Sequence, residues 1–158
     1  MKITLSSGFE IELYPPPVWK TWDLAAKKHP IPEPPVVSSE TVTGETVSMT
    51  IDDDPAYLKS LADREDAMTD TLAELNMLFA MRDLEVPEDF STEAFADEMK
   101  YVDSDWAPRE GKMGRKLDYI EYVLLAKTQD RMLVQGALNN FAAVDEEEVS
   151  RVRESFQD

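Results

Sequence analysis

The fold is decided where residues 51–58 read Ile-Asp-Asp-Asp-Pro-Ala-Tyr-Leu. Before this stretch apolar and polar residues alternate as in β-strands, and after it apolar residues recur with the period of a helix. Asp54 is a favoured N-cap residue, and Pro55 suits the first helical position because the N–H that it lacks would have no helical partner there. The stretch therefore predicts a helix start that separates a small β-rich subdomain, residues 1–51, from a helical subdomain, residues 52–158.

The β-rich part is expected to contain two hairpins and one short helix. Residues 3–5 and 9–13 alternate around a Ser-Ser-Gly turn, and residues 41–51, rich in β-branched side chains, predict a second hairpin that joins the first. Three prolines at 15–17 can start a helix that runs to Lys28. Its expected buried side carries Val18, Trp22 and Ala25, with Trp19 beside them, and a stiff Pro-rich connector follows at residues 29–35.

The remainder predicts about four to five helices. The first extends to about Leu84, and the second starts at Ser91 with Phe95, Met99 and Val102 on one side. A third region runs from about Arg115 to Ala126, Asp130 is expected to cap a continuation, and Asp145 has the capping-box spacing of a last helix. The predicted fold class is α+β, mainly α: a small N-terminal antiparallel sheet with one short helix, followed by a helical bundle.

Composition narrows the classes of function. The 158 residues include 16 basic and 33 acidic side chains, a net charge of −17, and residues 52–109 alone carry 5 basic and 17 acidic ones, a net −12. Such acidity argues against direct nucleic-acid binding, which needs a basic surface. There is no Cys, and no stretch approaches the roughly 20 apolar residues that span a bilayer. We expect a soluble intracellular protein without a membrane partner.

Residues with catalytic chemistry are few. The only His, His29, lies beside a rigid Pro and is interpreted as a turn or surface residue. Asp52-Asp53-Asp54 lacks the spacing of a calcium loop, so helix capping is the favoured interpretation. Residues 111–116, Gly-Lys-Met-Gly-Arg-Lys, lack Walker spacing and are interpreted as a flexible basic loop. We therefore expect no enzyme activity, no catalytic residue, no cofactor and no metal site.

One apolar stripe on the long helix is a candidate for partner binding. Its methionines would suit an adaptable surface for a helical partner if part of the stripe stays exposed. The alternative, which is favoured on general grounds, is that the stripe forms the domain's own core. The candidate residues are Leu58, Leu61, Met68, Leu72, Leu75, Met77, Leu78, Phe79 and Met81.

The order of these motifs resembles the tail assembly chaperones of long-tailed, siphovirus-type bacteriophages. A β-rich start and an aromatic helix are followed by the connector Pro32-Glu33-Pro34-Pro35 and a hairpin containing Gly44. The helix start Asp53-Asp54-Pro55-Ala56-Tyr57 comes next. The chain then closes with Glu147-Glu148-Val149 and Ser155-Phe156, so the resemblance covers most of its length.

The resemblance implies a non-enzymatic factor that binds the tape measure protein, helps to recruit tail-tube subunits, acts in the host bacterial cytoplasm and is absent from the mature virion. An oligomer is possible. Two other classes remain open at this point. One is an acidic nucleic-acid mimic that inhibits a host protein, which should arrange carboxylates at phosphate-like intervals on one rigid surface. The other is a structural head or tail component, which should remain in the virion.

Overall fold

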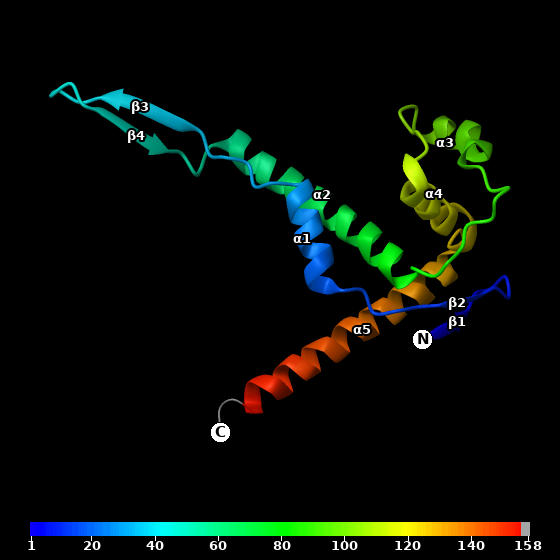
Figure 1. Ribbon diagram of the computed structural model, residues 1–158. Helices are drawn as coiled ribbons and strands as arrows, with labels where there is room; N and C mark the ends of the chain where they lie inside the picture. The colour runs from blue at the N-terminus through cyan, green and yellow to red at the C-terminus, as the bar shows by residue number, and fades with distance from the viewer. Residues whose placement is uncertain (156–158) are drawn as a thin grey trace. The chain divides into compact units, whose positions relative to one another are not determined.

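The computed structural model describes the backbone of residues 1–155 and the side chains of residues 1–141. Within that range the chain forms five α-helices and two separate two-stranded antiparallel sheets (Figure 1). The predicted class, α+β and mainly α, is confirmed. The chain divides into two compact units: one contains residues 1–17 and the chain from Asn76 onward, and the other contains Val18–Leu75. This division differs from the expected boundary at residue 51, because the long helix continues through both units.

The first unit begins with the predicted hairpin. Strand β1 (Lys2–Thr4) pairs with β2 (Glu10–Glu12), and Ile3 lies opposite Ile11. Gly8 has φ 83°, a left-handed conformation that favours glycine in the turn. Alternation places Ile11 and Leu13 in the core, whereas the neighbouring Glu side chains face solvent.

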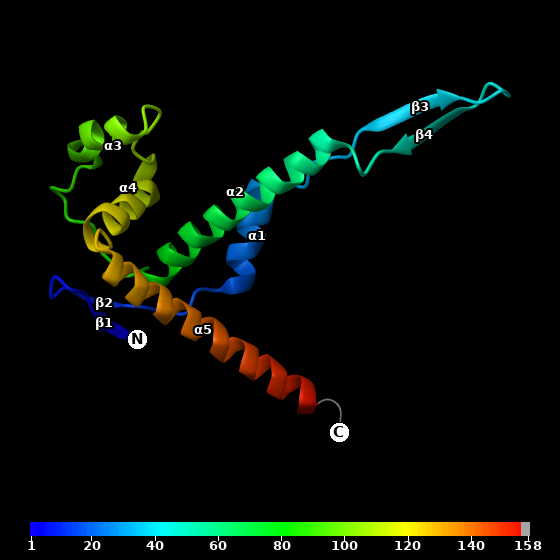
Figure 2. The ribbon, with the colours of Figure 1, turned by 180° about the vertical axis from the view of Figure 1, so that it is seen from behind.

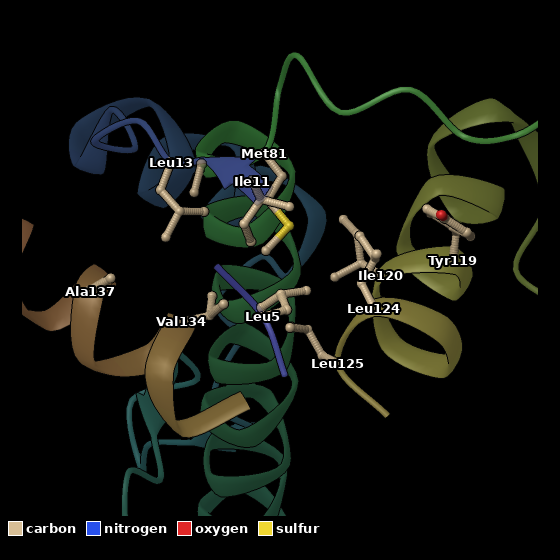
Figure 3. Packing of buried hydrophobic residues seen from close by; sticks show 11 residues of the cluster. Leu5, Ile11, Leu13, Met81, Tyr119, Ile120, Leu124, Leu125, Val134 and Ala137 are labelled. Atoms are coloured by element: carbon tan, nitrogen blue, oxygen red, sulfur yellow. The ribbon is translucent and has the colours of Figure 1, made fainter. Parts of the chain in front are cut away.

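The core of this unit brings together residues that are far apart in the sequence (Figure 3). Leu13 from the segment after β2, Met81 from the end of the long helix and Val134 from the last helix are almost completely buried. The backbone N–H of Tyr14 donates to the Ala80 carbonyl over 3.0 Å, which ties the N-terminal segment to the helix end. The β-hairpin is therefore part of the helical core.

Helix α4 (Gly111–Tyr119) corrects the prediction of a flexible basic loop at residues 111–116. Two of its three basic residues, Arg115 and Lys116, hold other parts of the chain in place. The Arg115 guanidinium donates to the carbonyls of Pro87, Glu88 and Phe90, and the buried Lys116 ammonium donates to the Arg82 carbonyl over 2.9 Å. Burial lowers the pKa of Lys116. These hydrogen bonds join α4 to residues 82–90, the segment that follows the long helix. Residues 111–116 are therefore an ordered part of a helix and not a flexible loop.

The predicted second helix is present in two pieces, the 3₁₀ turn η1 (Thr92–Phe95) and α3 (Ala96–Val102). Phe95 and Met99 are partly buried, as expected for an inward face. Val102 is exposed, which corrects its placement on that face. The helix ends there, so no further turn remains to cover this side chain.

The last part of the chain is more continuous than the sequence indicates. After the π-helical turn η2 (Ile120–Leu124), helix α5 runs unbroken over Thr128–Ser155 (Figures 1 and 2). The predicted helix start at Asp145 is therefore wrong. Asp130 also does not cap a helix: its carboxylate accepts hydrogen bonds from the backbone N–H and the hydroxyl of Ser6, at 2.8 and 2.6 Å.

The second unit contains α1 (Val18–Lys28), the hairpin of β3 (Val36–Glu40) and β4 (Thr46–Thr50), and most of α2 (Pro55–Ala80), as far as Leu75. Asp54 caps α2 as predicted, since its Oδ1 accepts from the N–H groups of Ala56 and Tyr57 at 3.0 and 2.9 Å. The expectation that this hairpin joins the first one is wrong. Within residues 1–155, β3 and β4 pair only with each other.

Candidate functional site

The candidate stripe on α2 is divided between the two units. Leu58, Leu61, Met68, Leu72 and Leu75 belong to the second unit. Leu58 is exposed and Met68 is buried, while the other three are partly buried. The stripe therefore does not form one continuous open face.

The last part of the stripe belongs to the first unit and contributes to its core. Met81 is only 1% exposed, and Met77 packs against the buried cluster. Leu78 and Phe79 are partly buried. For this end of the stripe the structure agrees with the favoured interpretation, in which the stripe forms the domain's own core. The segment after β2 contributes to this burial, since the Tyr14 N–H donates to the Ala80 carbonyl and Leu13 lies in the same buried cluster as Met81.

Helix α1 presents an apolar surface that we call the aromatic face: Val18, Trp19 and Trp22. Trp19 is 86% exposed and Trp22 is 53% exposed, and Val18 is also exposed. The helical repeat of 3.6 residues brings these positions to adjoining parts of the helix surface. Two large aromatic rings at the surface are unusual, because each ring leaves a large apolar area in water.

The expectation that the aromatic face lies on the buried side of α1 is corrected. The buried positions are Thr21 and Ala25, one helical turn apart, which are 1% and 0% exposed. Small side chains let a helix approach its neighbours closely, so they occupy the inner side and the bulky rings lie outside it. The Thr21 hydroxyl is satisfied within the helix by the Val18 carbonyl at 2.8 Å. Ala25 is buried as expected, and the missed signal is the small Thr21 one turn before it, at spacing i, i+4.

The C-terminal end of α1 is fixed to α2 by His29. Its Nε2 lies 2.8 Å from the Thr71 hydroxyl, and its backbone carbonyl accepts a hydrogen bond from Arg64 Nε over 2.8 Å. The imidazole is partly buried and pairs with a hydroxyl. The sequence suggests only a turn or surface residue at this position. In the structure His29 also holds α1, the helix with the aromatic face, against α2.

Charge on α1 differs from that of its surroundings. The helix carries Lys20, Lys27 and Lys28 against one carboxylate, Asp23, and Lys27 pairs with that carboxylate at 2.7 Å in an exposed ion pair. The rest of the unit is strongly acidic: residues 29–75 carry 2 basic and 11 acidic side chains, a net −9. The aromatic face thus lies on a locally cationic helix, which suits an apolar partner better than a highly basic one.

A second exposed apolar surface lies on the β3–β4 hairpin, and we call it the hairpin face: Val37, Val47 and Met49. Val37 lies opposite Met49, and Ser39 lies opposite Val47. Met49 is 69% exposed, and all ten strand residues are exposed. The opposite side of the hairpin is mostly polar, with the Ser38 and Ser48 hydroxyls 3.1 Å apart.

Other kinds of site have little support in the described part of the chain. Among the residues that the structure describes, no three His, Cys, Asp or Glu side chains are grouped to bind a metal ion. No helix within the same residues has the length and apolarity needed to cross a membrane. The aromatic face and the hairpin face are thus the features that point to binding. Comparison of the chain with protein-family models, with curated proteins and with solved structures finds no match in any of the three.

Proposed function

We propose that this chain is a non-enzymatic tail assembly chaperone of a long-tailed bacteriophage. It binds the tape measure protein through the aromatic face of α1, helps to recruit tail-tube subunits, and leaves before the virion is complete. Its place of action is the host bacterial cytoplasm. The proposed family rests on the resemblance of the motif order. The proposed binding role rests on one observation, the exposure of Trp19 and Trp22.

Paired surface tryptophans favour protein binding on physical grounds. Tryptophan is enriched among the residues that dominate interface energies, because one ring buries a large area and loses little conformational freedom. A tape measure chain is, by the resemblance, a long and partly apolar helix. Such a helix can place its apolar side against the aromatic face in the manner of helix-in-groove recognition.

The acidity of the chain supports the same role. A bare apolar helix aggregates, and a bound partner with a net charge of −17 would keep the complex soluble by repulsion between complexes. The negative field also speeds encounter with basic segments of a partner, within the ~8 Å over which charges act at physiological salt. In this proposal α1 makes the contact with the tape measure protein, and the acidic remainder of the chain keeps the complex soluble.

The test is co-purification of the tagged chain from infected cells, with mass spectrometry of the captured complexes and of finished particles. The expected result is tape measure protein in the complexes and no chain in the particles. Trp19→Ala with Trp22→Ala should reduce capture at least about tenfold, because each tryptophan at an interface centre contributes 1 kcal/mol or more, roughly. Leu24→Ala is the control, since Leu24 is an exposed apolar residue on the same helix but outside the aromatic face.

The remaining classes predict different outcomes. A nucleic-acid mimic would tolerate the double tryptophan variant but would lose binding to a host protein after Asp66→Lys with Asp70→Lys, two exposed carboxylates of α2. A structural component would be found in finished particles at a fixed ratio. Capture of tape measure protein that is unaffected in a folded Trp19→Ala, Trp22→Ala variant would remove the aromatic face from the proposal.

A further inference from the structure

The β3–β4 hairpin has two open edges within the described part of the chain. A two-stranded sheet is marginally stable alone in water, and three or more strands with an apolar face are usually needed. Exposed strand edges invite pairing, and proteins normally blunt them with Lys, Pro or a bulge. Here the register is continuous over five residue pairs, and neither strand contains Lys or Pro. The hairpin therefore lacks the usual protection.

Strand β4 is the better suited of the two edges. Its sequence, Thr46-Val47-Ser48-Met49-Thr50, carries no charge in a chain of net charge −17, whereas β3 ends in Glu40. The order of polar and apolar residues along β4 is the same when the strand is read from either end: Thr, apolar, Ser, apolar, Thr. An antiparallel pair of two such strands centred on Ser48 places Val47 opposite Met49 and Thr46 opposite Thr50. The strand is thus complementary to itself.

The backbone of β4 is oriented for such pairing. The N–H of Thr41 donates to the Glu45 carbonyl over 2.8 Å, and the N–H of Ile51 donates to the Pro35 carbonyl over 2.9 Å. Because hydrogen-bonding direction alternates along an antiparallel strand, the odd-numbered residues 45–51 direct their backbone groups toward β3. The N–H and C=O groups of Thr46, Ser48 and Thr50 therefore point to the open edge.

We propose that two copies of the chain pair through β4, about a two-fold axis at Ser48, to form a four-stranded antiparallel sheet in the order β3-β4-β4-β3. The backbone N–H and C=O groups of Ser48 form hydrogen bonds with those of Ser48 in the other copy. The backbone groups of Thr46 in each copy pair in the same way with those of Thr50 in the other. Val37, Val47 and Met49 of both copies then line one face of a wider sheet, as a closed symmetric dimer requires. This inference concerns self-association and is independent of the proposed phage function.

Charge separates this dimer from its main alternative, the addition of a basic strand from another protein. Residues 29–58 contain neither Lys nor Arg, and they contain six carboxylates: Glu33, Glu40, Glu45, Asp52, Asp53 and Asp54. A basic strand would bind this region less tightly at high salt. Two copies repel each other, so their association should strengthen with salt, since screening weakens the repulsion and leaves the uncharged β4 contact unaffected.

The first experiment measures the mass of the purified full chain by light scattering at a series of concentrations and salt levels. We expect a concentration-dependent approach to twice the 17.9 kDa chain mass, with a dissociation constant that falls as NaCl rises from ~0.05 to ~0.5 M. A monomer at every concentration and salt level would overturn the proposal, and so would dimerisation that weakens with salt.

A matched pair of proline variants locates the contact. Ser48→Pro removes an N–H that points to the open edge of β4, and it breaks no backbone bond within the hairpin. Ser38→Pro does the same on the open edge of β3, and both variants lose the Ser38–Ser48 hydroxyl contact. Ser48→Pro should raise the dissociation constant at least about tenfold, whereas Ser38→Pro should leave it unchanged. The reverse ranking would assign the contact to β3 and contradict the proposal.

Cross-linking gives a readout that does not depend on proline. The chain has no Cys, so Ser48→Cys would carry a single thiol. In the proposed dimer the two introduced thiol side chains lie directly opposite each other, with Cβ atoms ~5 Å apart, and a short bifunctional thiol reagent should link them into a covalent dimer. Ser38→Cys is the control, because three strand spacings separate its copies by ~14 Å. Equal cross-linking of the two variants, or none of Ser48→Cys, would count against the β4 pairing.

Discussion

The contact between Ser6 and Asp130 joins residues at opposite ends of the chain. Ser6 lies just after β1, and Asp130 lies in the first turn of α5. The serine hydroxyl and then its backbone N–H lower the pKa of the Asp130 carboxyl, because both donate to the ionised form. A carboxyl whose pKa is lower in the folded than in the unfolded state stabilises the fold above the unfolded value of 3.8, and this contribution is lost as pH falls through the folded pKa.

We therefore expect Ser6→Ala to destabilise the chain at pH 7 and to have a smaller effect at an acidic pH below 3.8, because the stabilisation is lost as pH falls through the lowered pKa of the folded state. Urea unfolding at the two pH values measures the difference. Ser7→Ala is the matched control, since Ser7 makes only a 3.4 Å contact with the Phe9 N–H in the same turn. An equal loss of stability at both pH values would show that packing, rather than the charged hydrogen bonds, explains the effect of Ser6→Ala.

Two helical glycines predict opposite effects of the same substitution. A Cβ on Gly114 would lie 2.7 Å from the backbone carbonyl carbon and the Cβ of Arg109, whereas a Cβ on Gly136 would meet nothing within 4 Å. The close approach at Gly114 is held by the buried Asp118, which accepts from the backbone N–H of Arg109 at 3.1 Å and from its guanidinium at 2.7 Å. Gly114 therefore occupies a position that a side chain cannot enter without movement of the backbone.

Gly114→Ala should lower the free energy of unfolding by about 1–3 kcal/mol, because the clash exceeds the gain in helix propensity of about 1 kcal/mol. Gly136→Ala should raise it by up to about 1 kcal/mol, since only the propensity term applies there. Chemical denaturation of both variants checks the signs. A stabilising Gly114→Ala would mean that residue 109 moves away easily.

For helices and strands, the sequence predicts well where an element starts, but it predicts poorly which side of the element is buried. Asp54 and Pro55 locate the start of α2, since capping depends on neighbours within one turn. The range of α1 is also predictable, but its most apolar residues, the tryptophans, indicate the wrong buried side. The structure buries Ala25, as expected, but buries Thr21 with it and leaves Val18 and Trp22 exposed. Which side of a helix faces inward depends on how closely its neighbour approaches, and that information is not local.

Elements held by distant residues are missed for the same reason. Residues 111–116 contain two glycines and three basic residues, a composition that indicates a loop, yet the carbonyls of residues 82–90 give Arg115 and Lys116 their partners. The candidate stripe on α2 is recognisably apolar, but the sequence cannot show that Met77 and Met81 pack in one unit while residues 58–75 belong to the other. The exposed aromatic face and the open β4 edge become visible only with the structure.

The Pro-rich connector yields a prediction at this scale. Residues 30–35 form neither helix nor strand between α1 and β3, although the Pro35 carbonyl accepts from Ile51. Pro32→Ala with Pro34→Ala should leave the helical circular dichroism nearly unchanged and should increase proteolytic cleavage within the connector, because the freed backbone samples more conformations. Loss of the helical signal would show that the two partly buried prolines are required for the whole unit.

At the scale of the whole molecule, repulsion between carboxylates opposes folding in both units. Residues 18–75 carry a net −7, and residues 1–17 with 76–158 carry 11 basic and 21 acidic side chains, a net −10. The exposed ion pairs Lys27–Asp23 and Lys59–Asp63 offset little of this, since surface pairs of this kind contribute about 0.3–0.5 kcal/mol. The balance of charge in the folded chain is therefore unfavourable at neutral pH.

Screening this repulsion should stabilise the chain. We expect NaCl at ~0.5 M to raise the melting temperature at pH 7 by several degrees, roughly the effect of 1 kcal/mol on a domain of this size. Near pH 4.3, where the net charge approaches zero, the same salt should have almost no effect. Because salt is also expected to strengthen pairing through β4, the comparison should use Ser48→Pro, in which dimer formation does not contribute. A salt effect of equal size at both pH values would show that it arises from general exclusion of salt from the protein surface rather than from screening of the net charge.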